Sequence, residues 1–214
     1  LRFLNDNTPP RITLDTPKTG DWVGREIEII GSLEDTSNIQ SLQYSTDKME
    51  TLSEIPFTEE AGKITFNTKA AFSHNEDGNV SLFIIATDKA GNKAIKPISL
   101  NKDTTNPDIT LLTPAAGEKI FTKRATVIIK VDDNGITDKV EISTDGTRYS
   151  RLFGNTLYKH TLNLSAIDSL PEKIYIRATD KSGNTRLLSP SISYNKAFIE
   201  SGNLRSGGMD YNEN

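Results

Sequence analysis

The sequence predicts an all-β protein built from two copies of one small antiparallel β-sandwich. The stretch ATDKAGN at 86–92 returns as ATDKSGN at 178–184, so six of seven residues recur at an offset of 92. Each copy of this stretch lies between two runs in which apolar and polar residues alternate. Alternation with a period of two is typical of half-buried strands, and a repeat of this length indicates a repeated domain.

The repeated stretch itself is predicted to be a tight β-hairpin turn. Gly91 and Asn92, with Gly183 and Asn184 in the second copy, end the stretch just before the next alternating run. Glycine and asparagine tolerate the positive φ angles that such turns require.

Seven short strands are expected in the first copy. The clearest alternation runs over 25–33, where Ile29, Gly31 and Leu33 share one face. Pro56 has no amide proton, so the run around it is expected at a sheet edge. The expected strands are 11–15, 25–33, 39–45, 55–57, 64–66, 80–88 and 93–100, with weak helical tendencies at 69–72 and 165–169.

The second copy repeats this order with different loop lengths. Residues 109–114 correspond to 12–17, and residues 140–145 correspond to 42–47. The offset changes from 97 to 98 and then to 92, which places the length differences in loops, where insertions cost little. We therefore expect a lead-in at 1–8, a first sandwich at 9–102, a joint at 103–107, a second sandwich at 108–196, and a flexible tail or linker at 197–214.

The composition argues against several classes of function. The net charge is −4 with no basic block, so nucleic-acid binding has no electrostatic source. No apolar run approaches the ~20 residues that cross a bilayer, so we expect no membrane insertion of this segment. The chain has no cysteine and therefore no disulfide. Because it begins at Leu1 rather than Met, we expect a segment of a longer or processed protein with flanking domains.

Catalytic chemistry is not expected from this sequence. The two histidines, His74 and His160, occupy non-equivalent positions, and nothing pairs either of them with a nucleophile. Neither a phosphate-binding glycine loop nor a zinc-ligand spacing occurs. We expect both histidines at the surface and the protein not to be an enzyme.

Several motifs resemble those of bacterial Ig-like and fibronectin-III-like repeats. They are ITLDTP at 12–17 with ITLLTP at 109–114, YSTD at 44–47 with ISTD at 142–145, and the ATDKxGN hairpin. The DTTNP joint at 103–107 looks like the joints between such repeats in large bacterial surface proteins. The resemblance covers residues 8–196 and implies two tandem seven-stranded antiparallel Ig-like/FnIII-like β-sandwiches. It departs from the Ig pattern where Tyr44 and Ile142 replace the buried third-strand tryptophan.

A calcium site at the joint is the first binding hypothesis. In an Ig-like domain, the loops between strands two and three and between strands six and seven lie at the pole where the chain comes in. Carboxylate and amide oxygens gather there, as Ca²⁺ prefers, and the expected ligands are Asp103, Asp132, Asp133, Asp180, Asn184 and Asp77. The first sandwich repeats the arrangement with Asp6, Glu34, Asp35, Asp88 and Asn92. The alternative is that these residues only form turns, which need no ion.

A ligand-binding patch is the second binding hypothesis. Tyr149, Phe153 and Tyr158 are expected to form an exposed aromatic cluster in the second sandwich, beside Arg148 and Arg151. Exposed aromatic side chains are typical of sugar-binding faces, so a protein or glycan partner would fit. The alternative is that these aromatics pack in the core or at a sheet edge.

The resemblance implies a role as well as a fold. It implies a non-catalytic structural or adhesive segment of a larger bacterial cell-surface or secreted protein, which spaces or presents a binding region. The implied location is extracytoplasmic: at the cell surface, secreted or in the periplasm. A second interpretation is a carbohydrate-binding or spacer accessory module of a secreted glycan-degrading enzyme.

Overall fold

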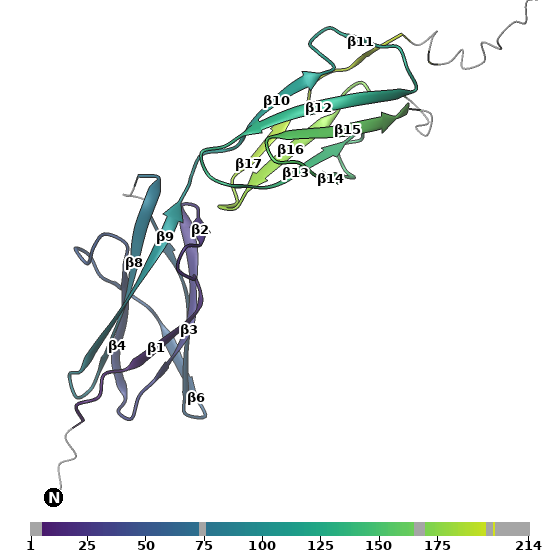
Figure 1. Cartoon of the computed structure of the whole chain (residues 1–214). Helices are drawn as coiled ribbons and strands as arrows, with labels where there is room; N and C mark the ends of the chain where they lie inside the picture. The colour runs from purple at the N-terminus through teal and green to yellow at the C-terminus, as the bar shows by residue number, and fades with distance from the viewer. Residues whose placement is uncertain (1–5, 73–75, 165–169, 196–198, 200–214) are drawn as a thin grey trace, which may run out of the picture. The chain divides into compact units, whose positions relative to one another are not determined.

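The computed structural model describes residues 6–72, 76–164, 170–195 and 199. Its contacts divide the chain into two compact units: unit 1 comprises residues 1–105 with 181–184, and unit 2 comprises 106–180 with 185–214 (Figure 1). His74, the helical tendency expected at 165–169, and all of the expected tail except Ile199 lie outside the described residues. In the part that is described, no helix is long and apolar enough to cross a membrane.

Unit 1 is formed by two sheets. One has the strand order β1-β3-β7-β6, and the other has the order β2-β9-β8-β4-β5. Seven strands longer than two residues are present in its described part, with the short β2 and β5 added to them. The bounds are β1 Arg11–Thr16, β2 Trp22–Val23, β3 Glu26–Glu34, β4 Ile39–Ser45, β5 Ser53–Glu54, β6 Phe57–Glu60, β7 Lys63–Ala71, β8 Gly78–Asp88 and β9 Lys93–Lys102.

Unit 2 repeats this plan with a smaller first sheet. Its sheets have the orders β10-β12-β15 and β14-β13-β16-β17, and the short β11 and β18 form a parallel pair. The bounds are β10 Asp108–Thr113, β11 Lys119–Ile120, β12 Arg124–Asp132, β13 Thr137–Ser143, β14 Ser150–Leu152, β15 Leu157–Asn163, β16 Tyr175–Asp180, β17 Thr185–Leu188 and β18 Ser193–Tyr194.

The two units also share their irregularities. The pairing of β1 with β3 shifts between Leu14 and Thr16, and the pairing of β10 with β12 shifts between Leu111 and Thr113. Each shift is followed by a cis Thr-Pro bond. The pairing of β4 with β8 shifts after Ile39, and that of β13 with β16 shifts after Thr137. The two units therefore share both their strand pairings and the bulges in those pairings.

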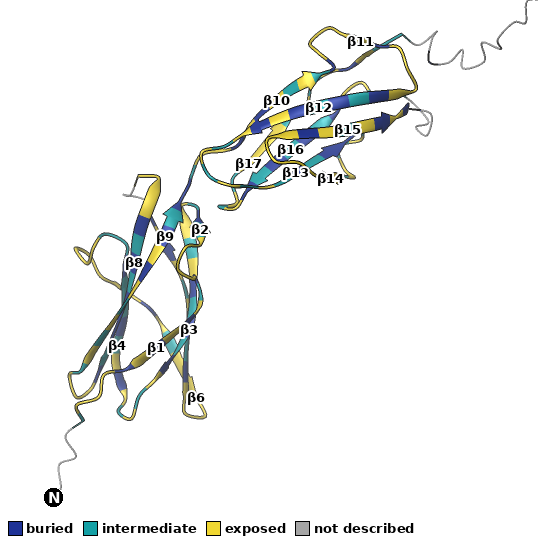
Figure 2. Ribbon diagram, viewed as in Figure 1, coloured by how far each residue is buried: buried dark blue, intermediate teal, exposed yellow. Residues whose placement is uncertain are grey.

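Each unit has its own hydrophobic core between its sheets. Buried residues alternate with less buried ones along the central strands, as Figure 2 shows for β12, and β8 in addition buries the consecutive residues Ile84, Ile85 and Ala86. The expected inward face of β3 is confirmed, because Ile29 and Leu33 are buried and Gly31 lies between them. Burying a side chain of this size stabilises the fold by roughly 1.5–3 kcal/mol, so this alternation fixes the register.

Three local expectations were wrong. Residues 69–72 are not helical, since β7 runs to Ala71 and buries Ala70 and Phe72 against the core. The run around Pro56 is two strands rather than one, because the chain passes there from the sheet containing β5 to the sheet containing β6. Ile199 belongs to the core of unit 2 and not to a free tail.

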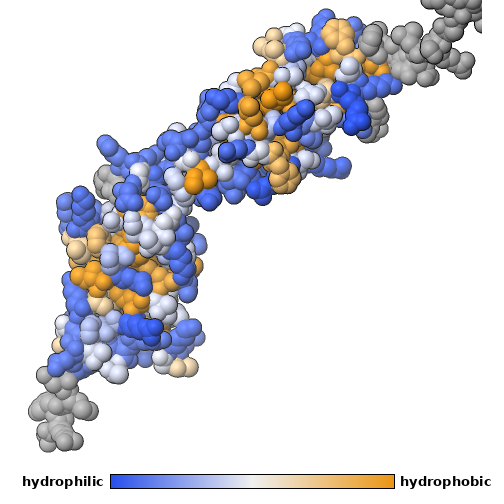
Figure 3. Space-filling view, in the orientation of Figure 1, coloured by the Kyte–Doolittle hydropathy of each residue, from blue (hydrophilic) through white to orange (hydrophobic). Residues whose placement is uncertain are grey.

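Apolar side chains also reach the surface of both units. Figure 3 shows orange areas on unit 1 and on unit 2 among hydrophilic surroundings. The large hydrophobic residues that are exposed in the described part are Met49, Leu52, Ile95, Leu112, Phe121, Ile136, Phe153, Leu157 and Leu187. Single exposed apolar residues are ordinary, so only a cluster that also forms a pocket points to binding.

Candidate functional site

The repeated hairpin places a buried carboxylate at the N-terminal pole of unit 1. The Asn92 N–H and its side-chain Nδ2 donate to the two carboxylate oxygens of Asp88, each at 2.8 Å. Gly91 takes a φ of 92°, which lets the turn close beneath these bonds. Asp88 is 0% exposed. The expected hairpin turn is confirmed, and the carboxylate of Asp88, which precedes the turn, is buried.

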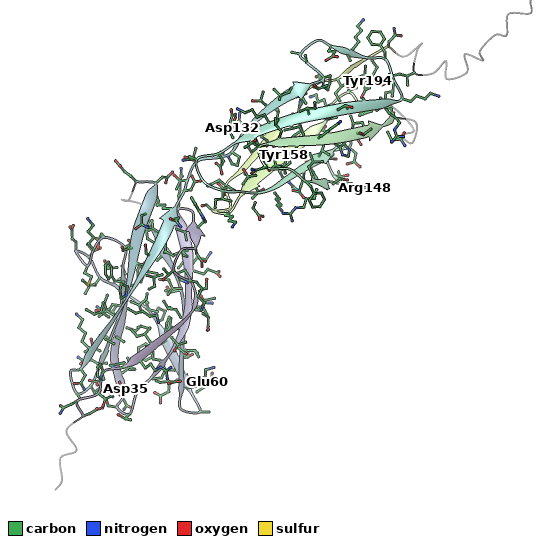
Figure 4. All side chains as sticks on the ribbon, viewed as in Figure 1. Asp35, Glu60, Asp132, Arg148, Tyr158 and Tyr194 are labelled. Carbon is green, nitrogen blue, oxygen red and sulfur yellow. The ribbon has the colours of Figure 1, made fainter. Side chains whose placement is uncertain are left out.

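Two further aspartates converge on Asp88 from other segments. Asp6 accepts hydrogen bonds from the Thr8 N–H at 2.9 Å and from the Thr36 hydroxyl at 3.2 Å. Asp35, in the β3–β4 loop, accepts from the Ser37 N–H at 2.8 Å through Oδ1. Asn92 Nδ2 also donates to the Asp6 carbonyl at 3.0 Å and so joins the lead-in to the hairpin. Figure 4 shows Asp35 at the pole where the N-terminal segment joins unit 1.

The three carboxylates form one compact acidic cluster. One oxygen from each of Asp6, Asp35 and Asp88 lies within 4.8 Å of the others. Asp35 Oδ2 is buried and has no hydrogen-bond partner among the described residues. None of the three carboxylates forms an ion pair with a described Lys or Arg. A buried carboxylate oxygen without a partner is costly, so this cluster lacks a positive counterpart.

Hydrogen bonding keeps two of these carboxyl groups ionised. The Thr8 N–H and the Ser37 side chain hold the pKa of Asp6 below its ordinary value. Burial acts to raise the pKa of Asp88, but hydrogen bonds from Asn92 outweigh it and lower that pKa. The mutual repulsion of the cluster is therefore not relieved by protonation near neutral pH.

The geometry of this cluster fits a hard divalent cation. Oxygens that share a Ca²⁺ at about 2.3–2.6 Å lie no more than about 5 Å apart. The separation within the cluster meets that limit. Glu34, also expected in this set, instead faces Arg11 at 3.4 Å. The cluster thus contains three of the four expected carboxylates, together with Asn92.

The same sequence positions in the second repeat are also acidic. The offsets between the two copies of the strands are 97, 98 and 92. At these offsets the counterparts of Asp6, Asp35 and Asp88 are Asp103, Asp133 and Asp180. Asp103 and Asn184 belong to unit 1, where Asn184 Nδ2 donates to the Asp103 carbonyl at 2.9 Å. Asp133 and Asp180 belong to unit 2. The calcium site expected at the joint therefore stays a prediction.

Two other residues of the expected calcium set have cationic partners instead. Asp77 accepts from Lys102 Nζ at 3.2 Å and from the Thr104 N–H at 2.9 Å. Burial acts to raise the pKa of Asp77, yet these bonds lower it. Asp132 lies 2.6 Å from Lys130 Nζ. Each carboxylate already has a neutralising contact, which makes it a weaker cation ligand.

The aromatic patch expected in unit 2 is only partly exposed. Tyr158 is 5% exposed and belongs to the core, so its place in an exposed cluster is corrected. Its side chain faces inward because β15 alternates, and its hydroxyl donates to the Asn155 carbonyl at 2.7 Å. Phe153, by contrast, is 85% exposed.

The remaining patch residues lie on or next to β14. The guanidinium of Arg177 lies 4.1 Å from the centroid of the Tyr149 ring, a cation–π contact that the sequence gave no reason to expect. Arg151 Nη2 donates to the Asp138 carbonyl at 3.0 Å. The Arg148 N–H donates to Asp145 Oδ1 at 2.8 Å. Of the five patch residues, Arg151, Phe153 and Tyr158 line one pocket, and Arg148 and Tyr149 do not.

The shared Ser-Thr-Asp motif has a structural explanation. The Ser45 and Ser143 hydroxyls lie 2.7 and 2.9 Å from Asp47 Oδ1 and Asp145 Oδ1. Hydrogen bonds from the Thr51 hydroxyl and N–H lower the pKa of Asp47 to about 2. Each motif thus ends its strand with a side chain that mimics a turn of backbone.

Comparison with known proteins gives the fold. No protein-family model and no curated protein matches the chain. The fibronectin(III)-like modules of Clostridium thermocellum CbhA match with a TM-score of 0.50 and 14% identity, covering 86% of this chain and 95% of that one. Titin domains match with a TM-score of 0.42 and 11% identity, covering 87% and 67%. A bacterial ice-binding adhesin matches with a TM-score of 0.38 and 13% identity, covering 88% and 66%. The likeness to CbhA, with the strand content, establishes an Ig/FnIII-like β-sandwich fold.

Proposed function

We propose that this chain is a non-catalytic structural or adhesive segment of a larger bacterial cell-surface or secreted protein, which spaces or presents a binding region. The observation that supports the proposal is the recurrence of the same bulges and the same hairpin sequence in both units. Repeating one domain lengthens a chain without requiring a new fold. Burial lowers the pKa of His160, and no described side chain hydrogen-bonds this residue, so His160 lacks the orienting partner that a catalytic histidine base usually has.

The test is replacement within the parent protein. Exchange of this segment for an unrelated pair of β-sandwiches of equal length should preserve the activity and the reach of the flanking domains. Deletion of one unit should shorten that reach. Loss of flanking activity in the equal-length exchange would contradict a spacing role.

A second candidate function is an accessory carbohydrate-binding module of a secreted glycan-degrading enzyme. The observation that favours it is the exposed ring of Phe153 beside a pocket in unit 2. Sedimentation with insoluble polysaccharides tests it. Co-sedimentation with any of them supports this function, and a chain that stays in the supernatant with all of them counts against it.

We further propose that Asp6, Asp35 and Asp88 hold a divalent cation, for which Ca²⁺ is the best match in ligand chemistry. The three carboxylates, the unpartnered Asp35 Oδ2 and the absence of a described ion pair support this. A bound ion would offset the repulsion between the carboxylates and fasten the lead-in to the hairpin.

Calorimetric titration of the metal-free chain with Ca²⁺ tests this site. Asp35→Asn keeps the oxygen that accepts from Ser37 and removes one charge, so it should weaken the binding attributable to unit 1 at least tenfold. Glu34→Gln is the matched control, because Glu34 faces Arg11 and lies outside the cluster. Equal affinity in the wild type and in Asp35→Asn would refute the site.

A further inference from the structure

Unit 2 has a pocket of about 430 Å³ beside the turn that joins β14 to β15. The β12–β13 loop and the start of β13 form one wall, and residues 151–156 with Tyr158 form the other. All lining residues belong to unit 2. A volume of this size falls within the range of about 300–1,000 Å³ that is usual for small-ligand pockets.

The corresponding connection is longer in unit 1. Ile55 and Leu152 hold equivalent buried places, as do Phe66 and Tyr158 on the next strand. Eleven positions separate the first residue from the second in unit 1, and six do so in unit 2. The extra residues form β6, from which Phe57 packs against the core of unit 1. Unit 2 has the single bridge between Gly154 and Tyr158 at that place. The shorter connection leaves Phe153 outside the core.

The backbone of the short turn beside Phe153 is closely packed. The Tyr158 hydroxyl donates to the Asn155 carbonyl at 2.7 Å. A Cβ atom at Gly154 would lie 2.3 Å from the Leu157 carbonyl oxygen, so the backbone is packed there without room for a side chain. A rim whose backbone is already formed before binding lowers the entropic cost of capturing a ligand.

The lining of the pocket combines apolar and polar groups with nearly balanced charge. Phe153 is 85% exposed and Ile136 is 43% exposed. The charged lining residues are three acids and two bases, namely Asp132, Asp133, Asp138, Lys139 and Arg151. Asp132 is already neutralised by Lys130 at 2.6 Å. Arg151 uses one N–H on the Asp138 carbonyl and retains further donors. Neither a strongly anionic nor a strongly cationic ligand matches this balance.

We propose that this pocket binds an uncharged glycan. The apolar C–H face of a sugar ring would lie on the Phe153 ring, while its hydroxyl groups exchange hydrogen bonds with Arg151 and the loop carbonyls. A flat aromatic surface next to hydrogen-bond donors and acceptors suits both the apolar face and the hydroxyl groups of a neutral sugar. This inference deepens the second candidate function by naming the site and the ligand class.

The test is affinity gel electrophoresis of the whole chain with uncharged soluble polysaccharides, namely a β-glucan, a mannan and a galactan. At least one should retard the protein, and Phe153→Ala should raise its dissociation constant tenfold or more. Phe121→Ala is the matched control, because Phe121 is an exposed phenylalanine of unit 2 outside the pocket, and it should bind like the wild type.

Each other outcome contradicts the proposal in a distinct way. Retardation that Phe153→Ala leaves unchanged would refute this pocket and leave the accessory function standing. Retardation only by an anionic polysaccharide such as a pectate would refute the neutral ligand class. Absence of retardation by every polysaccharide at saturating concentration would refute both the pocket and the accessory function. Circular dichroism of Phe153→Ala should match that of the wild type, since the ring lies outside the core.

Discussion

The two units place an aromatic ring over a glycine at different points of the same fold. In unit 1, Gly31 lies opposite Phe66 across β3 and β7, and a Cβ at Gly31 would lie 2.6 Å from the Phe66 ring. In unit 2 the equivalent pair is Ile129 and Tyr158. The Tyr158 ring instead lies against Gly154, where a Cβ would come within 2.9 Å of it. In each unit the aromatic ring therefore lies against the position that is occupied by glycine. This difference accompanies a second one, since unit 1 has a long connection that forms β6, and unit 2 has a short turn with a pocket beside it.

The largest expected effect is that of Gly31→Ala. The new methyl group would meet the Thr13 carbonyl oxygen at 2.2 Å, and that backbone atom cannot move without disturbing β1. We expect a loss of about 3 kcal/mol in the unfolding free energy of unit 1. Urea unfolding followed by Trp22 fluorescence measures it, because Trp22 is the only tryptophan and lies in unit 1. Ser32→Ala, on the opposite face, should shift the midpoint little. An unchanged midpoint in Gly31→Ala would mean that the contact is not as tight as described.

A somewhat smaller effect is expected for Gly154→Ala in unit 2. Its Cβ would lie 2.3 Å from the Leu157 carbonyl oxygen, yet the exposed turn has more freedom to adjust than the core. We expect a loss of about 2 kcal/mol. Circular dichroism should report this loss, while the transition seen by Trp22 stays in place. If the Trp22 transition moved equally, the two units would not unfold separately.

Exchange of the aromatic residues sharpens the comparison. Tyr158→Phe removes the hydrogen bond to the Asn155 carbonyl and should cost about 1 kcal/mol. Phe66→Tyr adds a hydroxyl to a ring that is 3% exposed and should destabilise unit 1 by about 1–3 kcal/mol unless it finds a partner. Neutral results for both variants would mean that the two positions are interchangeable.

The smallest expected effect is a pH dependence at the Ser-Thr-Asp turn. The Asp47 pKa is about 2 in the folded chain, below its ordinary value of 3.8. Its contribution to stability is therefore complete above about pH 4 and is lost as the pH falls toward about 2. Urea midpoints of the wild type should fall across this interval, and Asp47→Asn should reduce that fall. A fall of the same size in both proteins would contradict the role given to Asp47.

Alternation and turn chemistry made much of the fold predictable. The faces of β3 and the hairpin at Asp88 follow from local rules, since each depends on neighbours in sequence. The extension of β7 to Ala71 was missed because burial of Ala70 and of the following Phe72 in the core overrode a weak local preference. The inward position of Tyr158 was missed for a related reason. Its strand begins only after a shortened turn, and the strand's phase depends on where that turn ends.

The candidate sites depended more on long-range packing. The sequence predicted Asp6, Asp35 and Asp88 together because equivalent loops of a sandwich meet at one pole. It did not separate Glu34, whose ion pair with Arg11 comes from the pairing of β1 with β3. Nor did it indicate the pocket, which depends on the absence of a hairpin and not on a residue pattern. The fall in the offset between the two copies, from 98 to 92, was the signal that could have revealed the shorter connection and its pocket.

Thermal unfolding of the whole chain, followed by Trp22 fluorescence in excess EDTA and then in millimolar Ca²⁺, tests the cation site most directly. Ca²⁺ at 100 times its dissociation constant would stabilise unit 1 by about 2.7 kcal/mol. We predict a clear rise in the Trp22 midpoint for the wild type and for Glu34→Gln, and a distinctly smaller rise for Asp35→Asn, whose binding is expected to be at least tenfold weaker. No rise in the wild type, or an equal rise in Asp35→Asn, would contradict the site and leave the acidic cluster as a set of turns.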